Sequence, residues 1–210
     1  MTDTSREHRP QPSTRRFPSA LTLMLAWAGW VAGWALTPGL LAGGVGGWFS
    51  DDYATVILIE SLVAVVLAVP LVLLHKRFNR VLFAGDRLRW LYALPVVAGI
   101  ALPFHYGLIL PVALYMFWMA VSVFWQDYLT FGLLQSYVRE RFSSWAAVPM
   151  VAVTFWLGHV LFLPERFGLA HLVPSIAILV LGVVMALLRT RPRSIHLILS
   201  LHLTFYYLFA

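Results

Sequence analysis

The feature that most constrains this chain is a series of long apolar stretches separated by short polar or basic ones. A transmembrane helix needs about 20 mostly apolar residues. Seven stretches come close to that length, at residues 19–41, 53–75, 89–105, 107–138, 144–163, 171–188 and 194–210. Only 11% of the 210 residues are charged, against roughly 25% in a typical soluble domain. The sequence therefore predicts an all-α, polytopic transmembrane helical bundle of about seven spans.

The apolar pattern also divides the chain. Residues 1–17 are polar and basic, so we expect a disordered basic cytoplasmic tail there and a single transmembrane domain over residues 18–210. The stretch 107–138 is longer than a bilayer requires, which predicts that its helix tilts, breaks or protrudes. The glycine-rich segment 43–47 predicts a flexible connector. The chain has no cysteine, which excludes disulfides and thiolate metal sites.

The basic residues follow the same pattern. If the seven stretches alternate across a membrane, 14 of the 15 Lys and Arg residues fall on one side, and only Arg166 falls on the other. Cytoplasmic loops carry such an excess, so the N-terminus is expected to be cytoplasmic, in the plasma membrane of a bacterium. Membrane lipids are the expected surroundings. The net charge of +6 is spread over short clusters, which argues against a nucleic-acid partner.

Asp127 is the most informative polar residue within the apolar stretches. A charged group in hydrocarbon costs several kcal/mol, so it is a functional-site hypothesis by default. At 1.5 Å per residue, Asp127, His159 and His202 lie roughly 18, 24 and 12 Å from the cytoplasmic ends of their helices. We therefore expect three helices to bring one carboxylate and two imidazoles into one hydrated cavity.

That set of groups suits hydrolysis of a peptide bond. A carboxylate can take a proton from water, and an imidazole can orient the water or protonate a leaving amine. A second imidazole and the phenol of Tyr206 can donate hydrogen bonds to a developing oxyanion. No cofactor is needed for this chemistry. Two histidines and one carboxylate are also a common zinc set, so a divalent metal is left open.

Other polar residues have a structural interpretation beside the functional one. Gln126 shares a helical stripe with Ser122 and Thr130, where polar side chains often join transmembrane helices. Glu60 belongs either to the site or to a polar contact within the bundle. Asp127 itself would also serve as an interhelical hydrogen-bonding group.

The order of these motifs resembles the CAAX-protease and bacteriocin-processing family of intramembrane proteases (CPBP, or Abi). That family typically shows EExxxR, then FxxxH, then HxxxN or HxxxD. The corresponding segments here are 126–131, 155–159 and 202–206, within a resemblance that covers about 108–210. The second motif matches fully, and the departures are Gln126, Asp127, Phe131 and Tyr206.

The resemblance implies an endopeptidase that cleaves membrane-associated peptides or protein C-termini with an activated water. It implies that the residue at position 126 activates the water, that His159 assists the water, and that His202 stabilises the oxyanion, with Tyr206 in support. Our leading hypothesis gives the base role to Asp127 instead. An amide at Gln126 has no useful basicity, and Phe131 supplies no cation. A second hypothesis is therefore an inactive family member that binds a peptide or partner. A third is a small proton-coupled transporter that uses Glu60 and Asp127.

Overall fold

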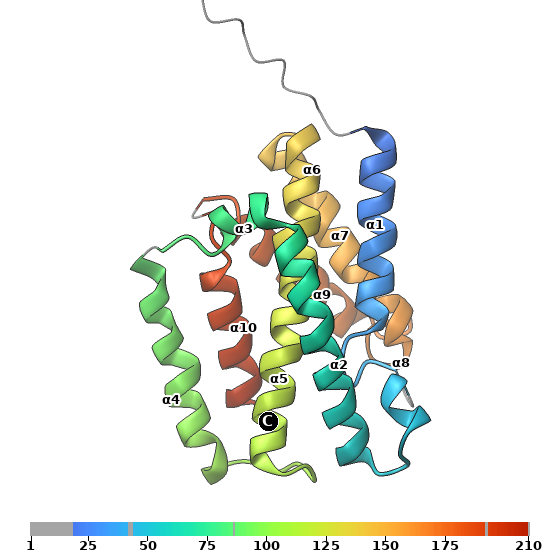
Figure 1. Ribbon diagram of the computed structural model, residues 1–210, viewed down its shortest axis with the longest axis vertical. Helices are drawn as coiled ribbons and strands as arrows, with labels where there is room; N and C mark the ends of the chain where they lie inside the picture. Colours follow the sequence, from blue (N-terminus) through green and yellow to red (C-terminus); the bar gives the residue numbers. More distant parts are fainter. Residues whose placement is uncertain (1–18, 42–43, 86, 192, 210) are drawn as a thin grey trace, which may run out of the picture.

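The computed structural model describes residues 19–41, 44–85, 87–191 and 193–209, and these contain helices and turns but no strand (Figure 1). The all-α prediction is confirmed for this part of the chain. The expected tail at 1–17 and Gly43 of the predicted connector lie outside the described residues. The elements in order are α1 (Ala20–Ala35), η1 (Val45–Trp48), α2 (Tyr53–Leu74), α3 (Lys76–Leu82), η2 (Arg87–Tyr92), α4 (Ala93–Ala101), η3 (Leu102–Phe104), α5 (Val112–Asp127), η4 (Tyr128–Leu134), α6 (Gln135–Arg141), α7 (Ser144–Phe162), α8 (Pro164–Phe167), α9 (Leu172–Leu188) and α10 (His196–Leu208).

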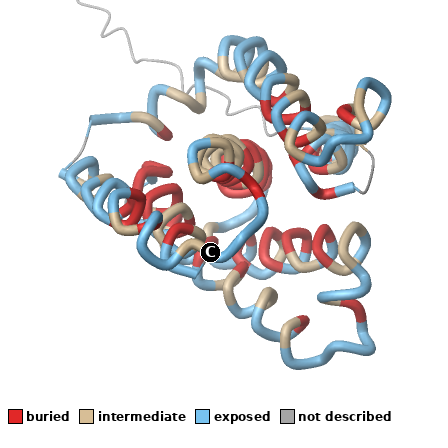
Figure 2. Tube along the Cα trace, turned by 90° about the horizontal axis from the view of Figure 1, so that it is seen from below, coloured by how far each residue is buried: buried red, intermediate tan, exposed pale blue. Residues whose placement is uncertain are grey.

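A long central helix organises the bundle. The elements α5, η4 and α6 run on without interruption, and η4 is a π-helical segment in which every residue is buried. The other helices surround this run, with buried residues facing inward and exposed residues facing outward (Figure 2). The stretch predicted to be too long for a simple span is thus a single helical run with a change of helical type in its middle.

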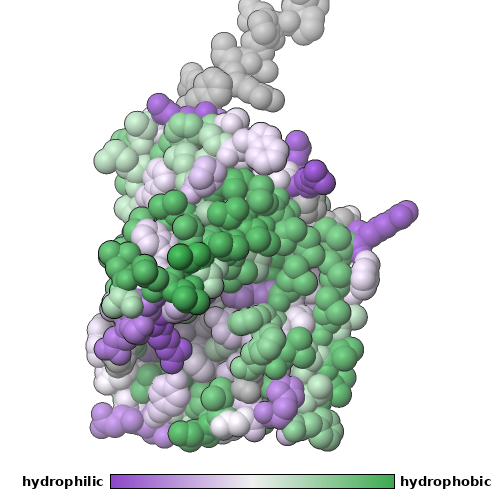
Figure 3. All heavy atoms as spheres, turned by 180° about the vertical axis from the view of Figure 1, so that it is seen from behind, coloured by the Kyte–Doolittle hydropathy of each residue, from purple (hydrophilic) through white to green (hydrophobic). Residues whose placement is uncertain are grey.

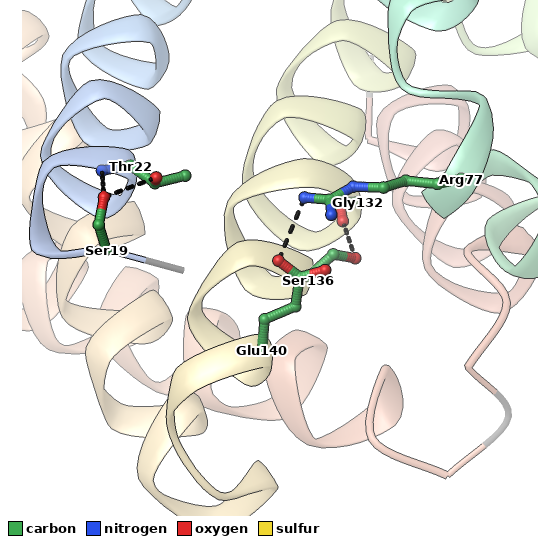
Figure 4. A network of polar contacts seen from close by, with 6 residues as sticks. All are labelled: Ser19, Thr22, Arg77, Gly132, Ser136 and Glu140. Carbon is green, nitrogen blue, oxygen red and sulfur yellow. Dashed lines mark hydrogen bonds and ion pairs between the residues drawn. The ribbon is translucent and has the colours of Figure 1, made fainter. Parts of the chain in front are cut away.

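Three helices begin at residues whose side chains cap them. The Ser19 hydroxyl accepts the backbone N–H of Thr22 at 3.1 Å at the start of α1 (Figure 4). Asp52 does the same for Thr55 at 2.9 Å at the start of α2, and Ser143 caps α7. Each cap satisfies one of the backbone donors that a helix leaves unpaired at its N-terminus.

Hydrogen bonds from two tryptophan side chains join α1 to the central run. The indole N–H of Trp30 donates to the Thr130 hydroxyl at 2.9 Å, and that of Trp125 donates to the Gly33 carbonyl at 2.7 Å. A buried indole N–H needs such a partner. These contacts give Thr130 the helix-joining role that the sequence offered for its stripe.

Two of the described helices, α2 and α7, are long and apolar enough to cross a membrane. Helices α1, α9 and α10 are apolar but shorter. Between two 3₁₀ segments, α4 has only nine α-helical residues. Hydrophobic side chains cover much of one face of the molecule, and hydrophilic ones lie mainly towards its two ends (Figure 3). The structure thus confirms the more general part of the prediction, which is a helical bundle that contains helices suited to a membrane.

Three basic segments lie together at one end of the bundle. They are α3, the end of α6, and the described residues between α9 and α10, all in the upper part of Figure 1. Arg77 of α3 pairs with Glu140 of α6 at 3.1 Å, and the Ile195 N–H donates to the Leu82 carbonyl at 3.0 Å. The short loops between helices bring these segments side by side, although they are distant in sequence.

Candidate active site

Asp127 and His202 form a buried pair between the central helix and the last one. The Nδ1 atom of His202 lies 3.0 Å and 3.2 Å from the two carboxylate oxygens of Asp127. Asp127 is 0% exposed and His202 is 5% exposed. Because a carboxylate only accepts hydrogen bonds, Nδ1 must carry the proton. In the neutral ring, Nε2 then holds the lone pair.

Asp127 sits where the central run changes its helical type. It is the last residue of α5, and the π-helical segment η4 begins at Tyr128. Such π-helical insertions are rare and often occur at functional sites. The widened turn starts immediately beside the carboxylate, so the local backbone geometry and the buried pair occur at the same place.

His159 is held separately, by its own helix and by aromatic rings. Its Nδ1 donates to the Phe155 carbonyl one turn earlier, at 3.0 Å, which leaves Nε2 as the basic nitrogen of the neutral ring. The rings of Trp34, Phe155 and Phe167 lie 5.5, 4.6 and 5.1 Å from the imidazole. The FxxxH motif thus has a structural basis in which Phe155 supplies both a ring contact and the carbonyl acceptor.

The structure brings two of the three predicted site residues into direct contact. Asp127 touches His202, and His159 is buried and within electrostatic range of His202. None of the three faces the outside of the bundle. Trp34 and Phe167, whose rings pack against His159, had no specific signal in the sequence, because any aromatic residue of an apolar helix looks the same there.

Tyr206 lies against the pair. Its ring stacks on that of His202 with centroids 5.2 Å apart and an interplanar angle of 28°. Its backbone carbonyl accepts the Tyr115 hydroxyl at 3.0 Å. Tyr206 therefore occupies the position one turn after His202 as a ring that restricts the imidazole.

The first motif has mixed surroundings. Gln126 is partly buried. Phe131, where the family pattern has arginine, is fully buried with its ring 5.3 Å from that of Phe155. The Ser122 hydroxyl faces the Pro38 carbonyl at 3.4 Å. Phe131 is thus part of the aromatic packing under His159, and a cation there would have no place in that packing.

Glu60 has a different environment from the pair. It is buried in α2, and its Oε2 accepts the Gly39 backbone N–H at 2.7 Å. A Cβ atom at Gly44 would lie 2.4 Å from Oε1 of Glu60, so the loop after α1 packs directly against this carboxyl. Glu60 therefore holds the backbone at Gly39 just after α1, and this hydrogen bond involves neither Asp127 nor a histidine.

Among the residues that the structure describes, no three His, Asp or Glu side chains are grouped closely enough to hold a metal ion. What the arrangement offers chemically is an oriented imidazole nitrogen with a free lone pair on His202 and a second one on His159. Both lie in a low-dielectric interior, where hydrogen bonds to a charged group are strong.

Comparison of the chain with models of known protein families, with curated proteins and with solved structures finds no match. The fold and the site therefore define the class only as an all-helical protein with a buried Asp–His pair.

Proposed function

We propose that this protein is an intramembrane peptidase built around the Asp127–His202 pair, with its N-terminus in the cytoplasm and seven membrane spans. The single observation that carries the proposal is the buried hydrogen bond of His202 to both oxygens of Asp127, at 3.0 and 3.2 Å. A charged carboxylate in the interior of an apolar bundle is costly, and here it orients an imidazole whose other nitrogen is basic.

The geometry favours a division of roles that differs from the one the family resemblance implies. Both oxygens of Asp127 face Nδ1 of His202, so Asp127 suits a positioning role better than that of base. We assign the base role to His202 Nε2, which takes a proton as water attacks the peptide carbonyl carbon. The resulting imidazolium returns that proton to the amine nitrogen when the C–N bond breaks.

His159 and Tyr206 complete the proposed machinery. His159 Nε2 is a second nitrogen that can orient the water, because its Nδ1 is committed to Phe155. The stacked ring of Tyr206 keeps the His202 imidazole in one plane. A groove of about 530 Å³ between α2 and α5 is lined by apolar side chains. This supports a substrate with an apolar, membrane-embedded segment.

The test compares the membrane peptides formed in cells that produce the wild type, Asp127→Asn, His202→Ala or Glu60→Gln. New peptide N-termini that depend on the wild type are expected to fall about 10³-fold or more with the first two variants, as for other oriented-histidine dyads. Glu60→Gln removes a buried carboxylate outside the pair, so it should keep the products. The same products from Asp127→Asn would overturn the peptidase proposal. Loss of activity in Glu60→Gln as large as that in Asp127→Asn would favour a proton-coupled transporter.

A second candidate, a non-catalytic protein that binds a peptide, is favoured by Phe131. This ring is fully buried against Phe155, where the family pattern has a cation. On this proposal the wild type forms no new N-termini, yet cross-links to a membrane peptide through a photoreactive residue at position 126. Cross-linking that Asp127→Asn leaves unchanged, with no cleavage by either protein, would support the binding role.

A further inference from the structure

A small pocket lies at the basic end of the bundle, away from the Asp–His pair. It has a volume of about 230 Å³ and lies between α3, α6 and the turn that joins α9 to α10. The polar residues that line it are Arg77, Ser136, Arg139, Glu140, Arg189 and Arg193. Three separate segments of the chain thus direct arginine side chains to one cavity.

The charges in this pocket are not balanced. Within the described residues that line it, Glu140 is the one carboxylate, and it pairs with Arg77 at 3.1 Å (Figure 4). The Arg77 guanidinium also lies 4.3 Å from the centroid of the Phe78 ring and 5.5 Å from that of Tyr137. Arg77 therefore has a carboxylate and two aromatic rings as partners, and Arg139, Arg189 and Arg193 remain as a positive group that lines the pocket.

Arg189 is the strongest indication of a ligand. Its side chain is only 3% exposed, and its Nε and Nη1 atoms make no hydrogen bond within the described part of the chain. Burial, together with the positive charges of Arg139 and Arg193, lowers the pKa of Arg189 to about 9. The group is still a cation at neutral pH. A buried cation without a partner is costly, so an anion in contact with it stabilises the fold.

The backbone around the pocket is also unusual. Arg193 has φ of 57° and is the non-glycine residue with a positive φ in the part of the chain that the structure describes. Residues other than glycine, asparagine and aspartate seldom adopt this left-handed backbone conformation. The turn therefore holds Arg193 in a disfavoured geometry beside Arg189, and strain of this kind gathers at ligand-binding sites.

We infer that this pocket binds a phosphate group. Several guanidinium groups around one small cavity match the tetrahedral oxygens of phosphate, which they contact through paired N–H donors. The Ser136 side chain adds a hydroxyl to the lining. The site is independent of the proposed peptidase activity. A phospholipid head group and soluble inorganic phosphate share this chemistry, and basic pockets between helices on the cytoplasmic side of a membrane are typical head-group sites.

The experiment measures binding in two arms with the full chain. In one, detergent-purified protein is titrated with inorganic phosphate by calorimetry. In the other, native mass spectrometry counts the phosphatidylglycerol molecules retained from mixed vesicles of phosphatidylglycerol and phosphatidylcholine. Four proteins are compared: the wild type, Arg189→Gln, Arg193→Gln and Arg80→Gln. Arg80 is an exposed arginine of α3 at the same end that does not line the pocket, so its variant is the matched control.

Binding in either arm should weaken about tenfold or more in Arg193→Gln, because one charge-assisted contact is lost. Arg189→Gln should weaken it at least as much, and Arg193→Gln keeps the test decisive if the buried variant does not fold. Arg80→Gln should bind as the wild type does. Retention of phosphatidylglycerol alone would identify a lipid as the source, and phosphate binding in the first arm would identify a soluble anion. Equal weakening by Arg80→Gln, or no binding in either arm, would overturn the inference.

Discussion

At the scale of single residues, the buried carboxylate of Asp127 is the group that the rest of the site must accommodate. It is fully buried in the central helix and meets His202 of the last helix at 3.0 Å. Breaking a buried pair by removing one partner usually costs about 3–5 kcal/mol, because the other partner is left in the interior without compensation. The pair thus couples the last helix to the centre of the bundle.

That coupling predicts a non-additive result. Asp127→Ala and His202→Ala should each lower stability, and the double variant should lose less than the sum of the two, with an interaction energy of about 1–3 kcal/mol. Free energies of unfolding of the detergent-purified proteins measure it. Strict additivity would show that the two side chains do not interact, and it would contradict the proposed Asp127–His202 site.

At the scale of elements, the contact between α7 and α1 positions His159. Gly158 precedes this histidine, and a Cβ atom at residue 158 would lie 2.9 Å from the Trp30 ring and 3.0 Å from the Trp34 ring. Real Cβ atoms are essentially never closer than 3 Å to another heavy atom, and rigid rings cannot yield as a flexible chain end would. Because Gly158 has no side chain, α7 can approach α1 closely enough for Trp34 to pack against the His159 imidazole.

Gly158→Ala should destabilise the protein by about 1–3 kcal/mol, because the added methyl overpacks a rigid contact. It should also lower the peptidase activity proposed here, since Trp34 must move relative to His159. The matched control is Gly29→Ala in α1, where a Cβ would meet nothing within 4 Å. Alanine favours a helix by about 1 kcal/mol over glycine, so this variant should be as stable as the wild type or more so. Thermal unfolding midpoints of the wild type and the two variants measure these effects. An unchanged midpoint in Gly158→Ala would show that the close approach of α7 to α1 is not required.

At the scale of the whole molecule, the distribution of basic residues supports the orientation proposed above. The segments that carry Arg77, Arg139 and Arg189 lie together in the upper part of Figure 1, and Arg166 belongs to α8, which lies lower, beyond the end of α7. An excess of arginine and lysine marks the cytoplasmic side of a membrane protein. The end with the proposed phosphate site would then face the cytoplasm.

The absence of cysteine from the chain makes this orientation directly measurable. Arg80→Cys and Arg166→Cys each introduce one thiol, and the proposed topology places these two positions on opposite sides of the membrane. A maleimide that cannot cross membranes should label Cys at position 166 in intact bacterial cells, and position 80 only after the cells are opened. Labelling of both thiols in intact cells, or of position 80 alone, would contradict the proposed topology.

Much of the fold followed from local properties of the chain. Helices occupy each of the seven predicted stretches, because hydrophobic runs bounded by polar residues and prolines can be recognised without knowing the neighbours. The stretch 107–138 was correctly singled out as unusual, but its π-helical segment was not foreseen. A change of hydrogen-bonding pattern within one helix depends on packing against α1, α3 and α7, and no apolar periodicity encodes it.

The sequence by itself determined which residues are the candidates for chemistry: one acid, Asp127, and two imidazoles, His159 and His202, in apolar surroundings where a polar group costs free energy. Only the tertiary structure decided that Asp127 meets His202 rather than His159, and that arginines from three segments share one pocket. Those pairings depend on how far each helix is rotated about its axis and on which helices are neighbours. Both are set by packing between residues that are far apart in sequence, such as Trp30 with Thr130 or Leu82 with Ile195.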